Sequence, residues 1–298
     1  MDTQYILFSG KGGVGKTSMA STTAVHHANL GHKTLLVTTD PAANLSDVFE
    51  QEIGHRITAI DGVEHLDAME IDPDKATEEY KEQSLAPMRE LFDDEMIRIA
   101  EEQLSGPCTE EMAAFDKFID FMDNDDYDVV IFDTAPTGHT IRLLELPVDW
   151  SKHIEESSKG SGNTCMGPVA MLTESKEKYD KAIAALRDKE RTDFIFVMQP
   201  ESSSLEETQR SSKDLQELGI YTGHLIINGL IPKEETVIPF FKGKYDRQQE
   251  IIEKTRSSFS EVPIKTMELF DSELKGVSMF KQCAERLYQE EAVYEPQP

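Results

Sequence analysis

The stretch GKGGVGKTS, from Gly10 to Ser18, decides the fold of this chain. It satisfies the pattern G-x-x-x-x-G-K-[ST] and stands between an apolar run at 5–8 and a helical pattern from 16 to about 30. Glycines let the backbone bring N–H groups around a phosphate, and the helix adds the positive end of its dipole. A glycine-rich turn without a ligand is the alternative, but the strand–loop–helix setting argues against it. We therefore predict a phosphate-binding loop formed by Gly10, Lys11, Gly12, Gly13, Val14, Gly15, Lys16, Thr17 and Ser18.

Four side chains in and beside this loop carry the predicted chemistry. Lys16 is expected to reach the β- and γ-phosphates of a nucleotide, and the Thr17 hydroxyl to ligate Mg²⁺. The runs LLVTTD and DVVIFD end in Asp40 and Asp133, at the carboxyl ends of two predicted strands. Asp133 is expected to hold Mg²⁺ through water, and Asp40 to orient the attacking water or accept its proton. Helix capping is the simpler alternative for each acid.

Short apolar runs alternate with helical patterns through most of the chain. Val/Ile-rich runs separated by helical segments are typical of a parallel sheet covered on both faces. After the first run, strands are expected at 33–38, 65–71, 129–132, 194–198, 225–227 and 264–267. The prediction is an α/β fold with a doubly wound, mostly parallel sheet.

Two acidic stretches with helical pattern, about 75–122 and 151–187, interrupt this alternation. They are expected to be helical additions at one end of the sheet. No internal repeat of the phosphate loop and no Pro/Ser-rich linker is evident. We therefore predict one P-loop NTPase domain over 1–298 with an inserted helical subdomain.

Composition limits the partners. The 298 residues contain 30 Lys+Arg and 57 Asp+Glu, a formal net charge of −27, and such a field repels nucleic acid and anionic membranes. The first residues lack a signal-peptide pattern, and no apolar run of membrane-spanning length occurs. Three cysteines fit neither a disulfide framework nor paired C-x-x-C ligands. We expect a cytoplasmic protein that binds no nucleic acid.

Lys11 is a second lysine that the basic loop pattern does not require. In this position it resembles the deviant Walker A loop of the MinD/nitrogenase-iron-protein class. The resemblance implies that Lys11 reaches across a dimer interface to the partner's nucleotide, and a cation supplied in this way accelerates phosphoryl transfer. A solvated surface lysine is the alternative.

Four segments together resemble the arsenical-pump ATPase and tail-anchored-protein targeting ATPase family. They are GKGGVGKTS, LLVTTDPAANLSDVF, DTAPTGHTIRLLELP at 133–147 and LFDSELKGVSMF at 269–280. The family implies ATP as the nucleotide, a switch in the segment 133–140 that links the nucleotide and effector sites, and an effector-binding role for the helical subdomain. It also implies that Asn228, which closes the run LIIN, contacts adenine. By itself, an Asn at a strand end is commonly a turn residue.

Two cysteines suggest the branch of the family. Cys108 precedes Thr109, a candidate N-cap, and Cys165 precedes a helical pattern whose Pro168 suits a first turn. Thiolates are favoured at helix N-termini, and they bind soft ions such as As(III) and Sb(III). Both contexts are similar to the metalloid-binding cysteines of the arsenical-pump branch, with His139 as a further ligand in that family. Packing as small buried hydrophobes is the alternative for both cysteines.

The third cysteine, Cys283, differs from these two. It belongs to an apolar helical stripe, which predicts core packing. The stripe consists of Val277, Phe280, Cys283, Ala284 and Leu287.

These observations lead to one prediction and its alternatives. We expect Mg-ATP hydrolysis stimulated by As(III) or Sb(III), as the catalytic subunit of a membrane arsenite or antimonite efflux pump to which the protein binds peripherally. Pump ATPases of the family commonly contain two halves, so a homodimer that closes on ATP would supply the second site. An arsenic metallochaperone is a candidate donor of the metalloid. A tail-anchored-protein targeting ATPase is the main alternative, although C-x-x-C is missing; a chromosome- or septum-positioning ATPase would need basic surfaces.

Overall fold

The computed structural model describes residues 3–40, 44–91, 93–105, 107–122, 126–134, 163–164 and 167–288. The chain divides into two compact units. The first contains Met1–Glu70, Asp125–Ile141 and Arg187–Pro298, and the second contains Ile71–Asn124 and Arg142–Leu186. The first unit holds the main sheet, and the second is mainly helical.

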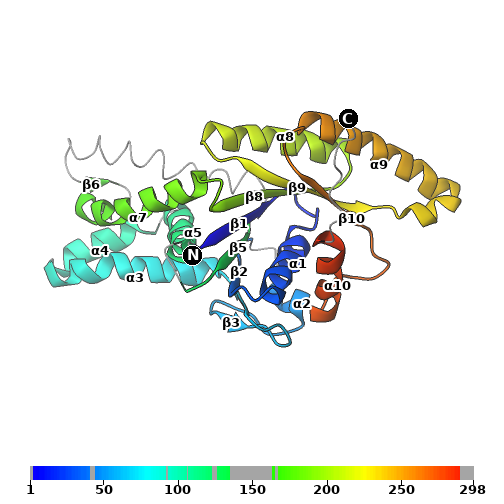
Figure 1. The fold of residues 1–298 in the computed structure, drawn as a ribbon. Helices are drawn as coiled ribbons and strands as arrows, with labels where there is room; N and C mark the ends of the chain where they lie inside the picture. The colour runs from blue at the N-terminus through cyan, green and yellow to red at the C-terminus, as the bar shows by residue number, and fades with distance from the viewer. Residues whose placement is uncertain are drawn as a thin grey trace. The chain divides into compact units, whose positions relative to one another are not determined.

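An eight-stranded sheet forms the first unit (Figure 1). In spatial order its strands are β10 (Ile264–Glu268), β9 (Thr222–Leu230), β8 (Thr192–Met198), β1 (Gln4–Ser9), β5 (Val129–Asp133), β2 (Thr34–Thr38), β4 (Leu66–Glu70) and β3 (Thr58–Ala59). Each described pair is parallel except β3 with β4. The predicted α/β fold is therefore confirmed, and every predicted apolar run falls on a strand. The two-residue β3 was not predicted because it is too short to show a period.

The register of the central strands brings the predicted functional residues to one edge. β1 pairs Phe8 with Asp133, and β2 pairs Thr38 with the same residue. Every residue of β2 and β5 is buried, as expected for strands covered on both faces. The order of strands reverses at β1, and ligands bind beyond the carboxyl ends of the strands at such a point.

Helices cover both faces of this sheet (Figure 1). α1 (Lys16–Asn29) packs against α10 (Val277–Tyr288), and α8 (Ser202–Glu217) packs against α9 (Pro239–Ser258). As predicted, α1 begins directly after the glycine-rich loop and ends before Gly31, whose φ of 88° favours glycine. Two short elements complete the unit, α2 (Leu45–Phe49) and the 3₁₀ helix η1 (Lys233–Val237).

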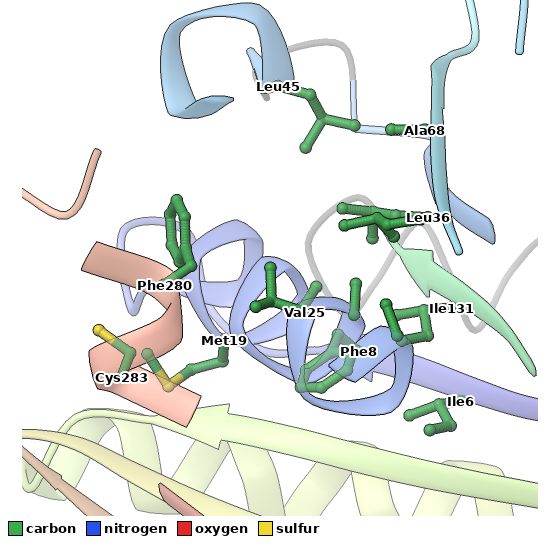
Figure 2. Close-up of a cluster of buried hydrophobic side chains, with 14 of the residues drawn as sticks. Ile6, Phe8, Met19, Val25, Leu36, Leu45, Ala68, Ile131, Phe280 and Cys283 are labelled. Carbon is green, nitrogen blue, oxygen red and sulfur yellow. The ribbon is translucent and has the colours of Figure 1, made fainter. Parts of the chain in front are cut away.

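The core of the first unit includes α1, α10 and the strands beneath them (Figure 2). Phe8, Met19 and Phe280 are fully buried there. Cys283 on α10 is fully buried in the same cluster, so its predicted core packing is confirmed. Burial raises the pKa of the Cys283 thiol to about 11. This cysteine therefore stays protonated at neutral pH.

The second unit is built from helices. They are α3 (Pro73–Leu91), α4 (Asp94–Gln103), α5 (Pro107–Met122) and α7 (Val169–Arg187), with a short antiparallel pair, β6 (Asn163–Thr164) and β7 (Gly167–Pro168). α3 packs against both α4 and α5. Lys178 on α7 lies 3.7 Å from the carboxylate of Asp116 on α5. Within the described ranges, every helix is too short or too polar to cross a membrane.

Candidate functional site

The glycine-rich loop connects β1 to α1 at the carboxyl edge of the sheet. Two of its glycines are required by close approaches of the backbone. A Cβ on Gly10 would lie 2.2 Å from the carbonyl oxygen of Val197, and one on Gly15 would lie 2.4 Å from Nδ2 of Asn228. Gly15 is also the N-cap of α1, with φ 94° and no side-chain cap. The first turn of α1 is therefore open for an anion at its positive end.

Lys16 and Asp40 form an ion pair beside this loop. The Nζ atom of Lys16 lies 3.6 Å from Oδ2 of Asp40, and the two side chains are only 5% and 11% exposed. Lys16 is the first residue of α1, and Asp40 lies two residues beyond the end of β2. The fold thus brings a buried cation and a carboxylate together. The sequence predicts that Lys16 binds phosphate and that Asp40 orients the attacking water or accepts its proton.

Asp133, the last residue of β5, is completely buried beside the loop. Its Oδ2 accepts a hydrogen bond of 2.7 Å from the Thr17 hydroxyl and one of 3.3 Å from the Thr38 hydroxyl. Its Oδ1 is buried and has no hydrogen-bond partner within the described part of the chain. Burial raises the pKa of Asp133 to about 6, and the Thr17 hydrogen bond and the charge of Lys16 oppose this rise.

This arrangement fits a magnesium ion. A hydroxyl and a carboxylate with a spare oxygen are hard ligands of the kind that Mg²⁺ prefers. Above pH 6 the carboxylate is mainly ionised, so it is available to a cation at neutral pH. A buried carboxylate oxygen without a hydrogen-bond partner is costly, and a cation at this position would offset that cost.

Asn228 lies in β9, and its side chain contacts the loop. Its Nδ2 donates a hydrogen bond of 2.9 Å to the Val14 carbonyl. A cavity of about 470 Å³ opens beside the ends of three strands and α9. Its lining includes Gln199, Gly229, Gln248 and Leu269. The structure therefore places Asn228 against the predicted phosphate loop, and its contact with adenine stays a prediction.

Lys11 differs from Lys16 in being exposed. Its Nζ donates a hydrogen bond of 3.2 Å to the Ser203 hydroxyl in the first turn of α8. This contact is a solvent-facing hydrogen bond between neutral and charged groups, which a phosphate could replace at small cost.

One contributing residue was missed by sequence reasoning. Glu70 ends β4, and its Oε1 accepts hydrogen bonds from the backbone N–H groups of Leu45 and Ser46, at the start of α2. It thereby fixes the start of α2. The signal was available, because an acid at the end of a strand had already identified Asp40 and Asp133.

The metalloid candidates are only partly described. Cys165, His139 and the rest of the segment 135–140 lie outside the described residues, as does the side chain of Cys108. The backbone of Cys108 lies in the first turn of α5, which begins at Pro107. The prediction that Thr109 is the N-cap was therefore wrong, because the preceding proline starts the helix earlier. Pro168 likewise belongs to β7 and not to the first turn of α7.

The sequence of this chain matches a known family. The model of the anion-transporting ATPase family matches residues 3–289. A provisionally named arsenical pump-driving ATPase of Halobacterium salinarum is 50% identical over 96% of this chain and 44% of its own length. The arsenical pump-driving ATPase of Escherichia coli is 41% identical over 93% of this chain and 48% of its own. ATPase GET3B of Arabidopsis thaliana is 34% identical over 92% of this chain and 76% of its own length.

This chain spans about half the length of the two pump-driving relatives that it matches. The similarity nevertheless covers nearly all of its own residues, including the loop, both acids and the strands that position them. The chain belongs to the anion-transporting ATPase family.

Proposed function

We propose that this chain hydrolyses Mg-ATP and that As(III) or Sb(III) stimulates the hydrolysis, as the ATPase unit of a membrane arsenite or antimonite efflux system. The observation that carries the proposal is the Thr17–Asp133 pair beside an open, glycine-rich helix N-terminus. The names of the H. salinarum and E. coli relatives supply the link to arsenical pumping.

The phosphates would bind to the backbone N–H groups from Gly10 to Ser18, with Lys16 on the β- and γ-phosphates. Thr17 and Asp133 would hold Mg²⁺, which when bound neutralises charge on the β- and γ-oxygens. Asp40 stands next to Lys16 and would accept the proton of the attacking water. The adenosine would occupy the 470 Å³ cavity, whose lining includes Gly229, the neighbour of Asn228 in β9, so that Asn228 would contact adenine.

The role proposed for Lys11 is to reach the nucleotide of a second copy of this chain. Its exposure and the solvent-facing position of its hydrogen bond to Ser203 leave it able to move. In that arrangement ATP favours the closed homodimer, because each phosphate group is then neutralised by lysines from both copies. An arsenic metallochaperone would deliver the metalloid to this dimer.

The metalloid site proposed consists of Cys108, Cys165 and His139, gathered from both copies. Trivalent arsenic is soft and is bound well by thiolates. If the ion binds the closed dimer more tightly than the open one, it must shift the population towards the hydrolytic form.

The test is phosphate release from ATP with and without As(III) or Sb(III), in wild type and in a Cys108→Ser/Cys165→Ser double variant. We expect stimulation in wild type, its loss in the double variant, and similar basal rates in both. Cys283→Ala is the matched control, because this thiol is buried in the core and should leave stimulation intact. Equal stimulation in wild type and the double variant would reject the metalloid site.

A second candidate is the tail-anchored-protein targeting ATPase. It is favoured by one observation: ATPase GET3B is matched over 76% of its length, against 48% for the E. coli pump-driving ATPase. The pump-driving relatives are more similar in sequence, with identities of 50% and 41% against 34% for ATPase GET3B, so we rank the pump-driving branch first. Specific capture of a peptide with an apolar membrane-spanning segment, together with no response to metalloids, would reverse that ranking.

A further inference from the structure

We infer that Asn228 and Gln199 are positioning residues that hold the phosphate loop in its binding conformation. The inference rests on the proposed function, because it assumes that phosphates bind to this loop. It adds a role that contact between Asn228 and adenine does not include. Two amide side chains from the ends of neighbouring strands, β9 and β8, donate to two successive carbonyl groups of the loop.

The direction of each hydrogen bond follows from its acceptor. A backbone carbonyl only accepts, so the group facing it must be the amide nitrogen of each side chain. Nδ2 of Asn228 lies 2.9 Å from the Val14 carbonyl, and Nε2 of Gln199 lies 3.4 Å from the Gly13 carbonyl. The first bond has ordinary length and is partly buried, whereas the second is long and exposed. Asn228 should therefore contribute more than Gln199.

Because the peptide group is planar, the hydrogen bond from Asn228 to the Val14 carbonyl also orients the N–H group of Gly15. The carbonyl of Val14 shares its peptide plane with the N–H of Gly15, and in a trans peptide the two point in opposite directions. By holding the carbonyl on its own side, Asn228 turns the Gly15 N–H to the opposite side of the loop. In the proposed complex that is the side of the phosphates.

The fit between the two residues is close. A Cβ on Gly15 would lie 2.4 Å from Nδ2 of Asn228, so the amide approaches the loop at a point where only glycine leaves room. The φ of 94° at Gly15 is also one that glycine adopts without strain. A preorganised loop binds its ligand without first losing conformational entropy, so the brace should raise phosphate affinity.

The experiment separates the phosphate from the base. Binding of Mg-tripolyphosphate, ATP and GTP is measured by calorimetry for wild type, Asn228→Leu, Asn228→Ala and Gln199→Leu. Leucine keeps the approximate volume of asparagine and removes the donor. Gln209→Leu is the control for Gln199→Leu, because Gln209 is on α8 and bonds to Ser258, outside the loop.

For Asn228→Leu and Asn228→Ala we expect tripolyphosphate affinity to fall about fivefold to tenfold, which is the usual worth of one such hydrogen bond. ATP affinity should fall by at least the same factor, because the proposed contact with adenine is lost as well. Gln199→Leu should lower both by about twofold, because its bond is long. The preference for ATP over GTP should not change in Gln199→Leu, and Gln209→Leu should bind as wild type. Unfolding curves for each variant ensure that only folded protein is compared.

The inference is overturned if both Asn228 variants bind tripolyphosphate as wild type does while their preference for ATP over GTP collapses. Asn228 would then read the base alone. A wild-type protein that binds neither ATP nor tripolyphosphate would instead reject the proposed function.

Discussion

The two edges of the central sheet bury ionisable groups with opposite results. At the carboxyl edge, Asp133 is fully buried, yet its pKa of about 6 leaves it mainly ionised at neutral pH, with one oxygen unpaired. At the amino edge, burial lowers the pKa of His26 and Lys265, and that of His27 to about 4. Burial disfavours the charged form at both edges. Asp133 stays mainly ionised because the Thr17 hydrogen bond and the charge of Lys16 oppose the effect of burial, whereas His27 is neutral at pH 7.

The ionisable groups at the amino edge pack around the side chain of Tyr288. The ring of His26 stacks on that of Tyr288 with 3.8 Å between centroids, and the Tyr288 hydroxyl hydrogen-bonds to Thr23 over 2.7 Å. Lys265 lies over the same tyrosine ring, 3.6 Å from its centroid. These contacts join α10 to α1 and β10, so the amino edge stabilises the fold. At the carboxyl edge, the burial of the Asp133 carboxylate lowers stability.

The largest effect that would test this contrast is expected from Asp133→Asn. The folded carboxyl has a pKa about two units above its ordinary value of 3.8, which corresponds to a cost of about 3 kcal/mol at pH 7. The neutral amide avoids this cost, so the metal-free variant should be more stable than wild type by up to about that amount. Urea unfolding in chelator measures the difference.

The same variant should lose its response to magnesium. With ADP present, Mg²⁺ should raise the unfolding temperature of wild type and leave that of Asp133→Asn nearly unchanged. A variant that is less stable without metal, or that responds to Mg²⁺ as wild type does, would remove Asp133 from the metal site.

A smaller effect is expected in the pH dependence of stability without metal. Between pH 3.8 and about 6 the folded state binds more protons at Asp133 than the unfolded state, so stability falls as pH rises. His27 acts in the opposite sense, because between about pH 4 and 6.5 the unfolded state binds more protons, so stability falls as pH falls. In Asp133→Asn the carboxyl no longer titrates, so the loss of stability caused by protonation of His27 as pH falls should be unopposed.

From pH 7 to pH 5, Asp133→Asn should therefore lose about 1 kcal/mol more than wild type in the free energy of unfolding. Urea unfolding at the two pH values makes the comparison. Parallel changes in the two proteins would mean that Asp133 does not titrate with a raised pKa.

The smallest effect is expected from Cys283→Ala in the core beneath α10. Removing one buried sulfur should lower the free energy of unfolding by about 1 kcal/mol, which is typical of a small cavity. Basal ATP hydrolysis should not change, because the thiol is protonated and lies outside the loop. A lost response to metalloids in this variant would show that the wrong cysteines had been chosen.

The sequence predicted the sheet and the loop well because both depend on local patterns. β1, β2 and β5 are continuous apolar runs, and Gly10, Gly15 and Lys16 follow the spacing of the phosphate-loop pattern. The acids Asp40 and Asp133 could be found because parallel strands end at one edge. Patterns of this kind need no knowledge of distant contacts.

Contacts between distant segments could not be predicted in the same way. The hydrogen bond from Asn228 to Val14 joins residues 214 positions apart, and nothing in either segment signals it. The start of α5 was misjudged at Thr109 because a good N-cap residue and a proline at the first helical position compete, and Pro107 prevailed. Glu70 could have been found as an acid at the end of a strand. Its hydrogen bond to the start of α2, however, joins residues 24 positions apart, and the sequence does not show that β4 ends beside α2.

The central claim, Mg-ATP hydrolysis at the carboxyl edge with Asp40 as the base, is tested most directly by Asp40→Asn. Phosphate release from Mg-ATP and ATP affinity are measured in parallel for this variant and wild type. We predict that turnover falls by about 10²- to 10⁴-fold, the usual contribution of a general base, while ATP binding persists through the loop and Lys16. Hydrolysis at the wild-type rate by Asp40→Asn would contradict this account.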